Sequence, residues 1–346
     1  MDLNHRIESF INLGNDLQGF IKGEKSGIDV EMFDSTLRRA ETQNKWFTRE
    51  NVITSIDAVS KWLTEESLVE WTSHYIKDFK SNKGGKIVGI IMAGNIPLVG
   101  FHDLLSVLIT GNKCLVKTST DDSVLIHFIV QRLIKIAPDF DSYITLTEGM
   151  LKDFDAVIAT GSNNTSRYFE QYFSKYPNII RKNRHSIAIL TGDENEKDLK
   201  GLGTDIFKYF GLGCRNVSKL FVPKGYDFDA FFKIMMNFNV VGQNQKYINN
   251  VDYHKAILLV NRVKFLDGGT LLLTESDDLH SPVGVINYSE YENLDEVEEY
   301  LLEKDSEIQC VVGRDKTPFG KAQKPELLDY ADNIDVLKFL FDFTNQ

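Results

Sequence analysis

From residue 86 onward the chain alternates short apolar runs with helical stretches, and this alternation limits the possible fold more than any other feature. The first run, residues 87–92, is a continuous β-type segment, typical of a strand buried on both faces of a parallel sheet. A turn and a helix over 97–110 are expected to follow it. The next predicted elements are a strand at 113–117, a helix at 123–137 and a strand at 155–159. Strands and helices that alternate at this spacing predict a doubly wound α/β domain.

A second α/β cycle follows the first. Strands are predicted at 186–190 and 218–222, and helices at 196–209 and 228–237. Residues 1–80 have apolar positions at helical spacing and are expected to form helices. Further elements are expected, in order, at 256–260, 283–287, 294–302 and 309–312. The pattern therefore predicts two α/β domains preceded by a helical layer.

The composition argues against several classes of function. With 346 residues the chain is long enough for two full hydrophobic cores. Its net charge of −11 opposes binding to the phosphate backbone of a nucleic acid. No stretch approaches the roughly 20 consecutive apolar residues that cross a bilayer, and the N-terminus lacks the basic segment and apolar core of a secretory signal. We therefore expect a cytoplasmic protein with no nucleic-acid partner and no membrane insertion.

Three cysteines, Cys114, Cys214 and Cys310, are too few and too scattered for a disulfide framework, and no Cys-x-x-Cys or His-x-x-x-His pair indicates zinc. No metal is expected. Two glycines, Gly211 and Gly213, closely precede Cys214. Glycines allow a tight turn and leave room for a substrate beside the sulfur, which favours a nucleophile. The alternative is inert packing, because free cysteines are among the most buried residue types.

Three turns follow predicted strands of the first domain, at 93–97, 118–122 and 160–165. In an open α/β sheet, ligands bind beyond the carboxyl ends of the strands, so these turns form the candidate binding edge. Gly161 and Ser162 lead into a helix, where backbone N–H groups can bind a phosphate. An ordinary helix cap explains these two residues equally well. The fingerprint G-x-G-x-x-G is absent after the first strand, so a standard Rossmann site is not supported.

Taken in order, these motifs resemble those of the aldehyde dehydrogenase superfamily, and in particular its acyl-CoA reductases, typified by the fatty-acyl-CoA reductase of bacterial bioluminescence. The resemblance covers roughly residues 40 to 346 and depends on the ordered set, which is more specific than any single motif. The matching segments are Ala93-Gly94-Asn95-Ile96-Pro97, Gly111-Asn112-Lys113-Cys114-Leu115-Val116-Lys117, Thr160-Gly161-Ser162, Gly211 to Cys214, and Ser281-Pro282-Val283. The resemblance implies an aldehyde-dehydrogenase-like fold, with a doubly wound cofactor domain and a second α/β catalytic domain.

The resemblance also implies roles for individual residues. Cys214 would be the catalytic nucleophile, and the Asn95 amide would help form the oxyanion hole. The residues that would bind the cofactor are Lys117, Thr120, Gly161, Ser162 and Asp278. Structural roles remain open as alternatives: Asn95 as a cap of the following helix, Lys117 as a solvated surface lysine, and Asp278 as a surface acid.

Two departures from the family pattern bear on the chemistry. Classical aldehyde dehydrogenases have a Glu-Leu-Gly-Gly-Lys motif whose glutamate activates water, whereas the aligned stretch here, residues 181–186, has no carboxylate. A thioacyl enzyme that water cannot easily attack persists until a hydride or another thiol reacts with it, which favours acylating chemistry. The glutamyl-phosphate reductase branch fits the same absence. NAD-preferring relatives often carry a glutamate three residues after the lysine, where this chain has Thr120. Threonine would not repel a 2′-phosphate, so NADPH is the expected cofactor and NADH the alternative.

We therefore expect residues 1–182 to hold the N-terminal helices and the NAD(P)-binding domain, and residues 183–312 the catalytic domain. Residues 313–346 are expected to form a tail that returns to the cofactor domain or to a neighbouring subunit. The predicted activity is NADPH-dependent reduction of an acyl-CoA, with a fatty acyl group, to an aldehyde through a thioacyl enzyme at Cys214. The alternatives are an acyl-phosphate reductase, a short-chain acylating aldehyde dehydrogenase, a nucleotide-binding module, or a catalytically silent acyl-carrying or structural subunit. A homo-oligomer and an acyl-activating partner protein are implied by the resemblance alone.

Overall fold

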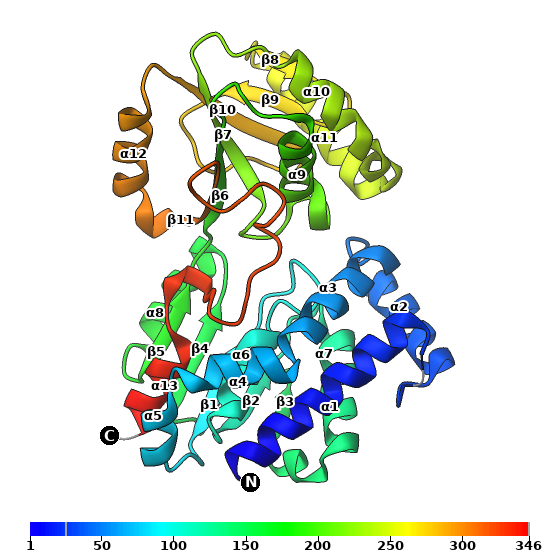
Figure 1. Ribbon diagram of the computed structural model, residues 1–346, viewed down its shortest axis with the longest axis vertical. Helices are drawn as coiled ribbons and strands as arrows, with labels where there is room; N and C mark the ends of the chain where they lie inside the picture. The colour runs from blue at the N-terminus through cyan, green and yellow to red at the C-terminus, as the bar shows by residue number, and fades with distance from the viewer. Residues whose placement is uncertain (25, 345–346) are drawn as a thin grey trace. The chain divides into compact units, whose positions relative to one another are not determined.

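The computed structural model describes residues 1–24 and 26–344 and divides into two compact units. Unit 1 contains Met1–Lys182 and the residues from Glu326 onward, and unit 2 contains Asn183–Pro325. Each unit has one β-sheet with helices around it (Figure 1). The α/β class predicted from the alternating pattern is confirmed.

Unit 1 is built on a five-stranded parallel sheet with the order β3-β2-β1-β4-β5. The strands are β1 (Ile87–Ile91), β2 (Lys113–Lys117), β3 (Ile144–Thr147), β4 (Ala156–Thr160) and β5 (Asn178–Arg181). The sequence predicted β1, β2 and β4, which are largely apolar runs. It missed the edge strands β3 and β5, which have four residues each and include polar positions. Because β2 and β4 lie on opposite sides of β1, the strand order reverses there, and such a reversal opens a crevice at the carboxyl ends of the strands.

Five α-helices of unit 1 precede its sheet, in the region, residues 1–80, that the sequence predicted to be helical. The α-helices of unit 1 are α1 (Leu3–Lys22), α2 (Val30–Gln43), α3 (Arg49–Trp62), α4 (Glu65–Ser73), α5 (Ile76–Ser81), α6 (Phe101–Ile109), α7 (Ser123–Ile136), α8 (Asn163–Phe173) and α13 (Val336–Thr344). A buried ion pair joins α6 to β5: the two terminal nitrogens of Arg181 donate to the two carboxylate oxygens of Asp103 at 2.6 and 2.9 Å.

The helix expected from residue 97 begins later, at Phe101, and this corrects the sequence analysis. Residues 97–100 form a turn in which Leu98 has φ 59, in the left-handed region. The buried Asp122 supports this turn, because its Oδ2 accepts the Leu98 N–H at 2.7 Å. Gly100 is the N-cap of α6, so Asn95 does not cap that helix.

Unit 2 has a six-stranded sheet with the order β11-β6-β7-β10-β9-β8, parallel except for the antiparallel pair of β8 and β9. Its strands are β6 (His185–Ile189), β7 (Val217–Pro223), β8 (Phe265–Asp267), β9 (Leu272–Glu275), β10 (Val285–Tyr291) and β11 (Ile308–Val312). Its helices are α9 (Glu196–Phe207), α10 (Asp229–Met235), α11 (Gln245–Val260) and α12 (Leu294–Glu303). The sequence did not predict β8 and β9.

Unit 2 continues beyond residue 312, where the sequence analysis placed the end of the catalytic domain. Val312 forms a β-bridge with Thr317. The buried carboxylate of Asp205, on α9, accepts the N–H groups of Gly320 at 2.6 Å and Ala322 at 3.2 Å. These bonds keep the chain with unit 2 as far as Pro325.

The last part of the chain joins unit 1 through a buried polar network. The hydroxyl of Tyr330 accepts from Trp71 Nε1 at 2.8 Å and lies 2.9 Å from the hydroxyl of Tyr75. Tyr75 also donates to Asp335 at 2.7 Å. The end of the chain therefore extends the helical layer of the same unit that holds the five-stranded sheet.

Candidate active site

The loops that follow β1 and β2 lie side by side at the carboxyl edge of the unit 1 sheet. A Cβ at Gly94 would come within 2.3 Å of Ser119 Oγ, so only glycine allows the loops to approach this closely. The bond from the Leu98 N–H to Asp122 joins the same two loops a few residues further on. Burial raises the pKa of Asp122 well above its ordinary value, which favours the neutral carboxylic acid. The two loops are thus fixed against each other.

Asn95 and Thr120, predicted as an oxyanion-hole residue and a cofactor-binding residue, are exposed on these two loops. The carbonyl of Thr120 accepts a hydrogen bond from the side chain of Gln43, at the end of α2. The structure therefore brings Asn95 and Thr120 to the same edge of the sheet, where the crevice beside β1 lies.

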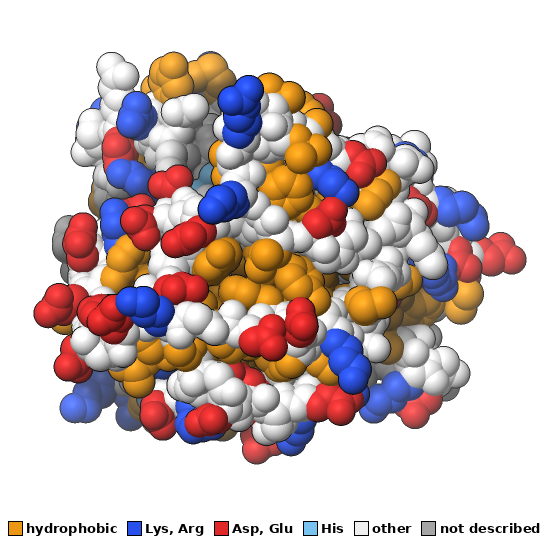
Figure 2. All heavy atoms as spheres, turned by 90° about the horizontal axis from the view of Figure 1, so that it is seen from above, with side chains coloured by type: hydrophobic (Ala, Val, Ile, Leu, Met, Phe, Trp, Pro, Cys, Tyr) orange, Lys and Arg blue, Asp and Glu red, His pale blue; other side chains and the backbone are white. Residues whose placement is uncertain are grey.

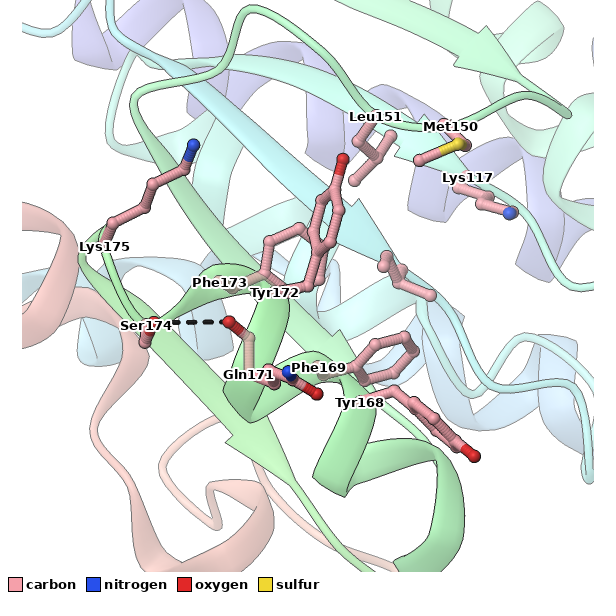
Figure 3. A pocket seen from close by; sticks show the side chains of 11 residues that line it. Lys117, Met150, Leu151, Tyr168, Phe169, Gln171, Tyr172, Phe173, Ser174 and Lys175 are labelled. Carbon is pink, nitrogen blue, oxygen red and sulfur yellow. Dashed lines mark hydrogen bonds between the residues drawn. The ribbon is translucent and has the colours of Figure 1, made fainter.

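A cavity of about 660 Å³ opens beside the end of β2, and Lys117 lines it. Figure 3 shows Lys117 and Met150 next to each other, across the pocket from Tyr168 and Phe169 of α8. Tyr172, one turn further along α8, also lines the pocket. Aromatic walls with a cation at the rim suit a planar heterocycle that carries a phosphorylated sugar. Sequence analysis assigned Lys117 to cofactor binding but did not predict the aromatic wall.

Gly161 and Ser162 lie between β4 and α8. Ser162 is the N-cap of α8, because its Oγ accepts the Thr165 N–H at 3.3 Å. The structure therefore contains the helix cap that the sequence left open as an alternative. A phosphate can bind at the same N-terminus, because the cap does not exclude it. A Cβ at Gly161 would approach Phe169 to 3.0 Å and Thr165 to 3.1 Å, so glycine lets the turn pack closely on α8.

Cys214 is exposed in the loop between α9 and β7, whereas Cys114 and Cys310 are buried. Burial raises the pKa of the Cys114 thiol well above its ordinary value, which keeps that thiol protonated and unreactive. Among the three cysteines, Cys214 is therefore the one whose thiol can meet a substrate.

A run of left-handed backbone leads into the Cys214 loop. Tyr209, Phe210 and Gly211 have φ values of 51, 58 and 76. Glycine adopts this conformation freely, but a bulky residue pays about 1–3 kcal/mol of strain, which persists only where the surroundings hold it. Both aromatic side chains are buried, and the Phe210 ring packs 5.9 Å from that of Tyr247. Such strain is typical of functional sites.

Asp278 lies on an exposed loop, residues 276–280, between β9 and β10. Every backbone carbonyl of this loop accepts a hydrogen bond from a side chain of unit 2. Lys219 donates to the carbonyl of Ser276, Tyr300 to that of Asp277, and Ser218 to that of Leu279. Asn287 donates to the carbonyls of Asp278 and His280. The loop backbone is therefore fixed, and it presents the Asp278 carboxylate at the surface.

Lys219, on β7, is fully buried, and its ammonium group donates to the carbonyl of Ser276 at 2.5 Å and to Ser289 Oγ at 2.7 Å. Burial lowers the pKa of Lys219 to about 8, and the nearby carboxylates of Asp277 and Asp278 oppose that shift. The side chain is thus charged at neutral pH and loses its proton in mildly alkaline solution.

We expect the wild-type protein to gain stability relative to Lys219→Met as the pH rises from about 8 to 10.5. In this window the unfolded chain keeps the lysine proton and the folded chain has lost it, so the free energy of unfolding increases with pH, by about 3 kcal/mol in total. Urea unfolding of both proteins at several pH values measures the difference. Parallel pH profiles for the two proteins would contradict the lowered pKa.

His185, at the start of β6, has its ring 5.2 Å from the ring of His280. Burial is the main cause that lowers the pKa of His185, and the charge of His280 adds to it, while Glu307 opposes it. A neutral imidazole can accept a proton, so His185 is a candidate base. It precedes Ser186, whose hydroxyl binds the Cys214 loop.

Sequence analysis missed two side chains that hold the Cys214 loop. Ser186 Oγ donates to the carbonyl of Cys214 at 2.9 Å, and the side chain of Asn216 accepts the N–H of Gly213 at 2.8 Å. Both residues are buried. The available signal was that Ser186 lies near the start of an apolar strand and Asn216 directly before one. A polar group buried at such a place needs a hydrogen-bond partner.

The molecular surface carries both signs of charge. On the face shown in Figure 2, Lys and Arg side chains alternate with Asp and Glu, with apolar side chains between them. Across residues 1–24 and 26–344, no helix has the length and apolar character needed to span a bilayer.

Sequence comparison connects the chain to one family. The profile of the family described as acyl-CoA reductase (LuxC) matches residues 24–231, more than half of the chain. The long-chain acyl-protein thioester reductase of Vibrio harveyi is 22% identical over 215 residues, which are 58% of this chain and 42% of that protein. The enzyme of the same name from Aliivibrio fischeri is 25% identical over 139 residues, 36% of this chain and 29% of that protein. The matched region thus spans less than half the length of each of these relatives.

Solved structures with a similar fold include aldehyde dehydrogenases. Aldehyde dehydrogenase 21 from Physcomitrella patens aligns with a TM-score of 0.66 at 11% identity, over 99% of this chain and 85% of that one. An aldehyde dehydrogenase from Bacillus cereus, in an NAD⁺ complex, aligns with a TM-score of 0.62 at 13% identity, over 90% and 72%. These similarities confirm the aldehyde-dehydrogenase-like fold that the motifs implied. With this fold, and with the profile match across more than half of its length, the chain belongs to the acyl-CoA reductase (LuxC) family.

Proposed function

We propose that this protein reduces an acyl thioester to an aldehyde through a thioacyl enzyme formed on Cys214. The observation that carries the proposal is the exposed thiol of Cys214 in a glycine-containing loop that strained, buried aromatic residues lead into. Family membership supports acyl-reductase chemistry. Without a carboxylate in residues 181–186 to activate water, the acyl group would wait on the sulfur for a reductant.

In the proposed mechanism the Cys214 thiolate attacks the thioester carbonyl and a carbon–sulfur bond forms. The Asn95 amide and the Cys214 N–H would stabilise the negative charge on the oxygen, and a single donor of this kind contributes about 3–4 kcal/mol to catalysis. The carbonyl re-forms as the donor thiol leaves, which makes a thioacyl enzyme. After reduction of the acyl carbon, the resulting thiohemiacetal expels Cys214 and releases the aldehyde. His185 is a candidate for moving the protons.

The cofactor we propose is NADPH, which when bound would supply the hydride for the reduction. The residues of unit 1 fit it: the aromatic pocket beside Lys117 suits the adenine, and the N-terminus of α8 at Gly161 and Ser162 suits a phosphate. Thr120 puts no negative charge near a 2′-phosphate. In unit 2, Asp278 on its fixed loop would bind a ribose hydroxyl.

The acyl donor could be carried by coenzyme A or by a protein. The family is described as acyl-CoA reductase, whereas the curated relatives are named for a long-chain acyl-protein thioester. Both donors present the same thioester to the same thiol, so the proposed chemistry is unchanged, and an acyl-activating partner protein would supply the second donor. We favour a long acyl chain because of the relatives' names.

The test is to mix the purified protein with NADPH and with butyryl-, decanoyl- and palmitoyl-CoA, and to follow the loss of nicotinamide absorbance and the formation of aldehyde. We expect oxidation of NADPH that depends on the thioester and is faster with the longer chains, and slower oxidation of NADH at equal concentration. Acyl phosphates are tested in parallel. Oxidation with acyl phosphates alone would replace the thioester proposal, and the absence of oxidation with every donor would contradict reductase activity.

A further inference from the structure

We propose that Asn216 and Ser186 form a clamp that positions the Cys214 sulfur for attack on the acyl carbon; this inference rests on the proposed function. Neither side chain touches the reacting atoms. The Ser186 side chain binds the carbonyl of Cys214, and the Asn216 side chain binds the N–H of the preceding residue, Gly213, so both act through Cys214 as positioning residues.

Asn216 ties the nucleophile loop to the end of α9. Its Nδ2 donates to backbone carbonyls of the last turn of that helix and of Lys208, at 2.8–3.2 Å. Its Oδ1 accepts the N–H of Gly213, the residue before Cys214, at 2.8 Å. The backbone N–H of Asn216 also donates to the Gly213 carbonyl at 3.0 Å. One buried carboxamide thus fixes the residue before the nucleophile relative to a helix end.

Ser186 holds the other side of the nucleophile. Its hydroxyl donates to the carbonyl of Cys214 itself at 2.9 Å, and the Ser186 side chain is fully buried at the start of β6. The peptide group after Cys214 is therefore bonded to the buried side chain of Ser186. The peptide group before Cys214 is bonded, through the Gly213 carbonyl, to the backbone N–H of Asn216, whose side chain also holds the N–H of Gly213. With both peptide groups held, the direction of the Cα–Cβ bond of Cys214 is fixed.

The clamp explains how the left-handed run at residues 209–211 is maintained. That run reverses the chain between the end of α9 and the loop, and strained backbone relaxes unless neighbouring bonds hold it. Asn216 bonds to both sides of the run, to α9 and Lys208 before it and to Gly213 after it. Loss of these bonds would let the loop relax and move the sulfur.

Misplacement of a reacting atom by about 1 Å can cost roughly 100-fold in rate. We therefore expect Ser186→Ala and Asn216→Asp to slow acylation of Cys214 by about 10- to 100-fold. Alkylation by iodoacetamide needs no fixed approach direction, so we expect its rate at Cys214 to stay within about threefold of wild type, because the thiol remains exposed. In turnover, kcat should fall and KM for the thioester should change little.

Matched controls lie in the same sheet. Ser218→Ala removes a serine-to-carbonyl bond of 2.8 Å, to Leu279, and a longer one of 3.4 Å to the backbone carbonyl of Ser186. Asn287→Asp alters a buried asparagine that donates to two carbonyls. The shorter bonds hold the 276–280 loop, and both substitutions leave the bond from the Ser186 hydroxyl to the Cys214 carbonyl in place. Acylation is measured as thiol released from decanoyl-CoA without NADPH, with the acyl group located on Cys214 by peptide mass spectrometry. We expect both controls to be acylated at the wild-type rate.

The outcomes separate the clamp from the proposed function. If the wild type is acylated and the clamp variants are acylated as fast as the controls, the clamp is wrong and the proposed function stands. If acylation and alkylation fall together, the substitutions act on the thiol or on folding, and positioning is also contradicted. If the wild type is not acylated by any donor, the proposed function fails and the clamp with it. Should Asn216→Asp not unfold cooperatively, Ser186→Ala, which removes a single hydroxyl, decides the question.

Discussion

Replacing Cys214 with serine is expected to lower acyl-dependent oxidation of NADPH by roughly 10⁴-fold or more, to background, as removal of a catalytic nucleophile does elsewhere. A serine hydroxyl is far less ionised than a thiol at neutral pH and is a weak nucleophile without an adjacent base. Because the Cys214 side chain is exposed, the substitution should leave the free energy of unfolding within about 0.5 kcal/mol of wild type. The loss of activity would then report chemistry rather than folding.

The matched control is Cys310→Ser. Cys310 is buried, and its sulfur lies 3.3 Å from Thr317 Oγ1, a contact that a serine hydroxyl can keep. We expect this variant to oxidise NADPH at the wild-type rate. Trapping without NADPH gives a second measurement: the wild type should gain the mass of one acyl group on Cys214, and Cys214→Ser should not. Retention of more than about a tenth of the activity by Cys214→Ser would exclude a thioacyl enzyme at this residue.

Asp103→Ala is expected to destabilise unit 1 by about 3–5 kcal/mol, the usual cost of leaving one partner of a buried ion pair unpaired. Asp103 and Arg181 are each 5% exposed, and their two hydrogen bonds are bidentate. Without the carboxylate, a guanidinium group would remain buried between α6 and β5. The double variant Asp103→Leu with Arg181→Met should recover most of the loss, since an apolar pair of similar volume avoids the buried charge.

An adjacent ion pair provides the control. Lys182 and Glu170 are about half exposed and 2.7 Å apart, so Glu170→Ala should change stability by less than about 1 kcal/mol. Urea unfolding followed by circular dichroism measures all four proteins. An Asp103→Ala variant no less stable than Glu170→Ala would show that the buried pair contributes little.

Sequence reasoning predicted the elements whose pattern is local and missed those that depend on neighbours. The apolar run of β1 and the spacing of the helices are properties of short segments, so they could be read directly. β5, four residues with an arginine at its end, becomes a strand because it pairs with β4 and because α6 supplies a partner for that arginine. The start of α6 was misplaced for the same reason: Asp122, more than twenty residues further along the chain, holds the turn at Leu98.

The residues of the candidate site also fall into two groups, those with a local sequence signal and those that depend on neighbours distant in sequence. The glycines before Cys214 predicted an accessible cysteine, and the structure exposes it. Lys117 was assigned by motif, but the aromatic wall of its pocket needed the orientation of α8, which the sequence does not give. Asn216 and Ser186 were missed because their hydrogen bonds connect segments separated in sequence. A single polar residue in a sequence does not identify its hydrogen-bond partner. How Cys214 and Asn95 work together remains part of the proposal.

The ion pair of Asp103 and Arg181 also has an evolutionary consequence. Arg181 opens the stretch that resembles the motif in which classical aldehyde dehydrogenases carry the glutamate that activates water. A glutamate at position 181 would face the buried Asp103, so a single substitution would put two carboxylates together with no cation between them. A chain with this core must change Asp103 first, or both residues at once, before position 181 can hold a carboxylate. Two mutations, each expected to be harmful alone, would thus be needed to place a carboxylate at position 181.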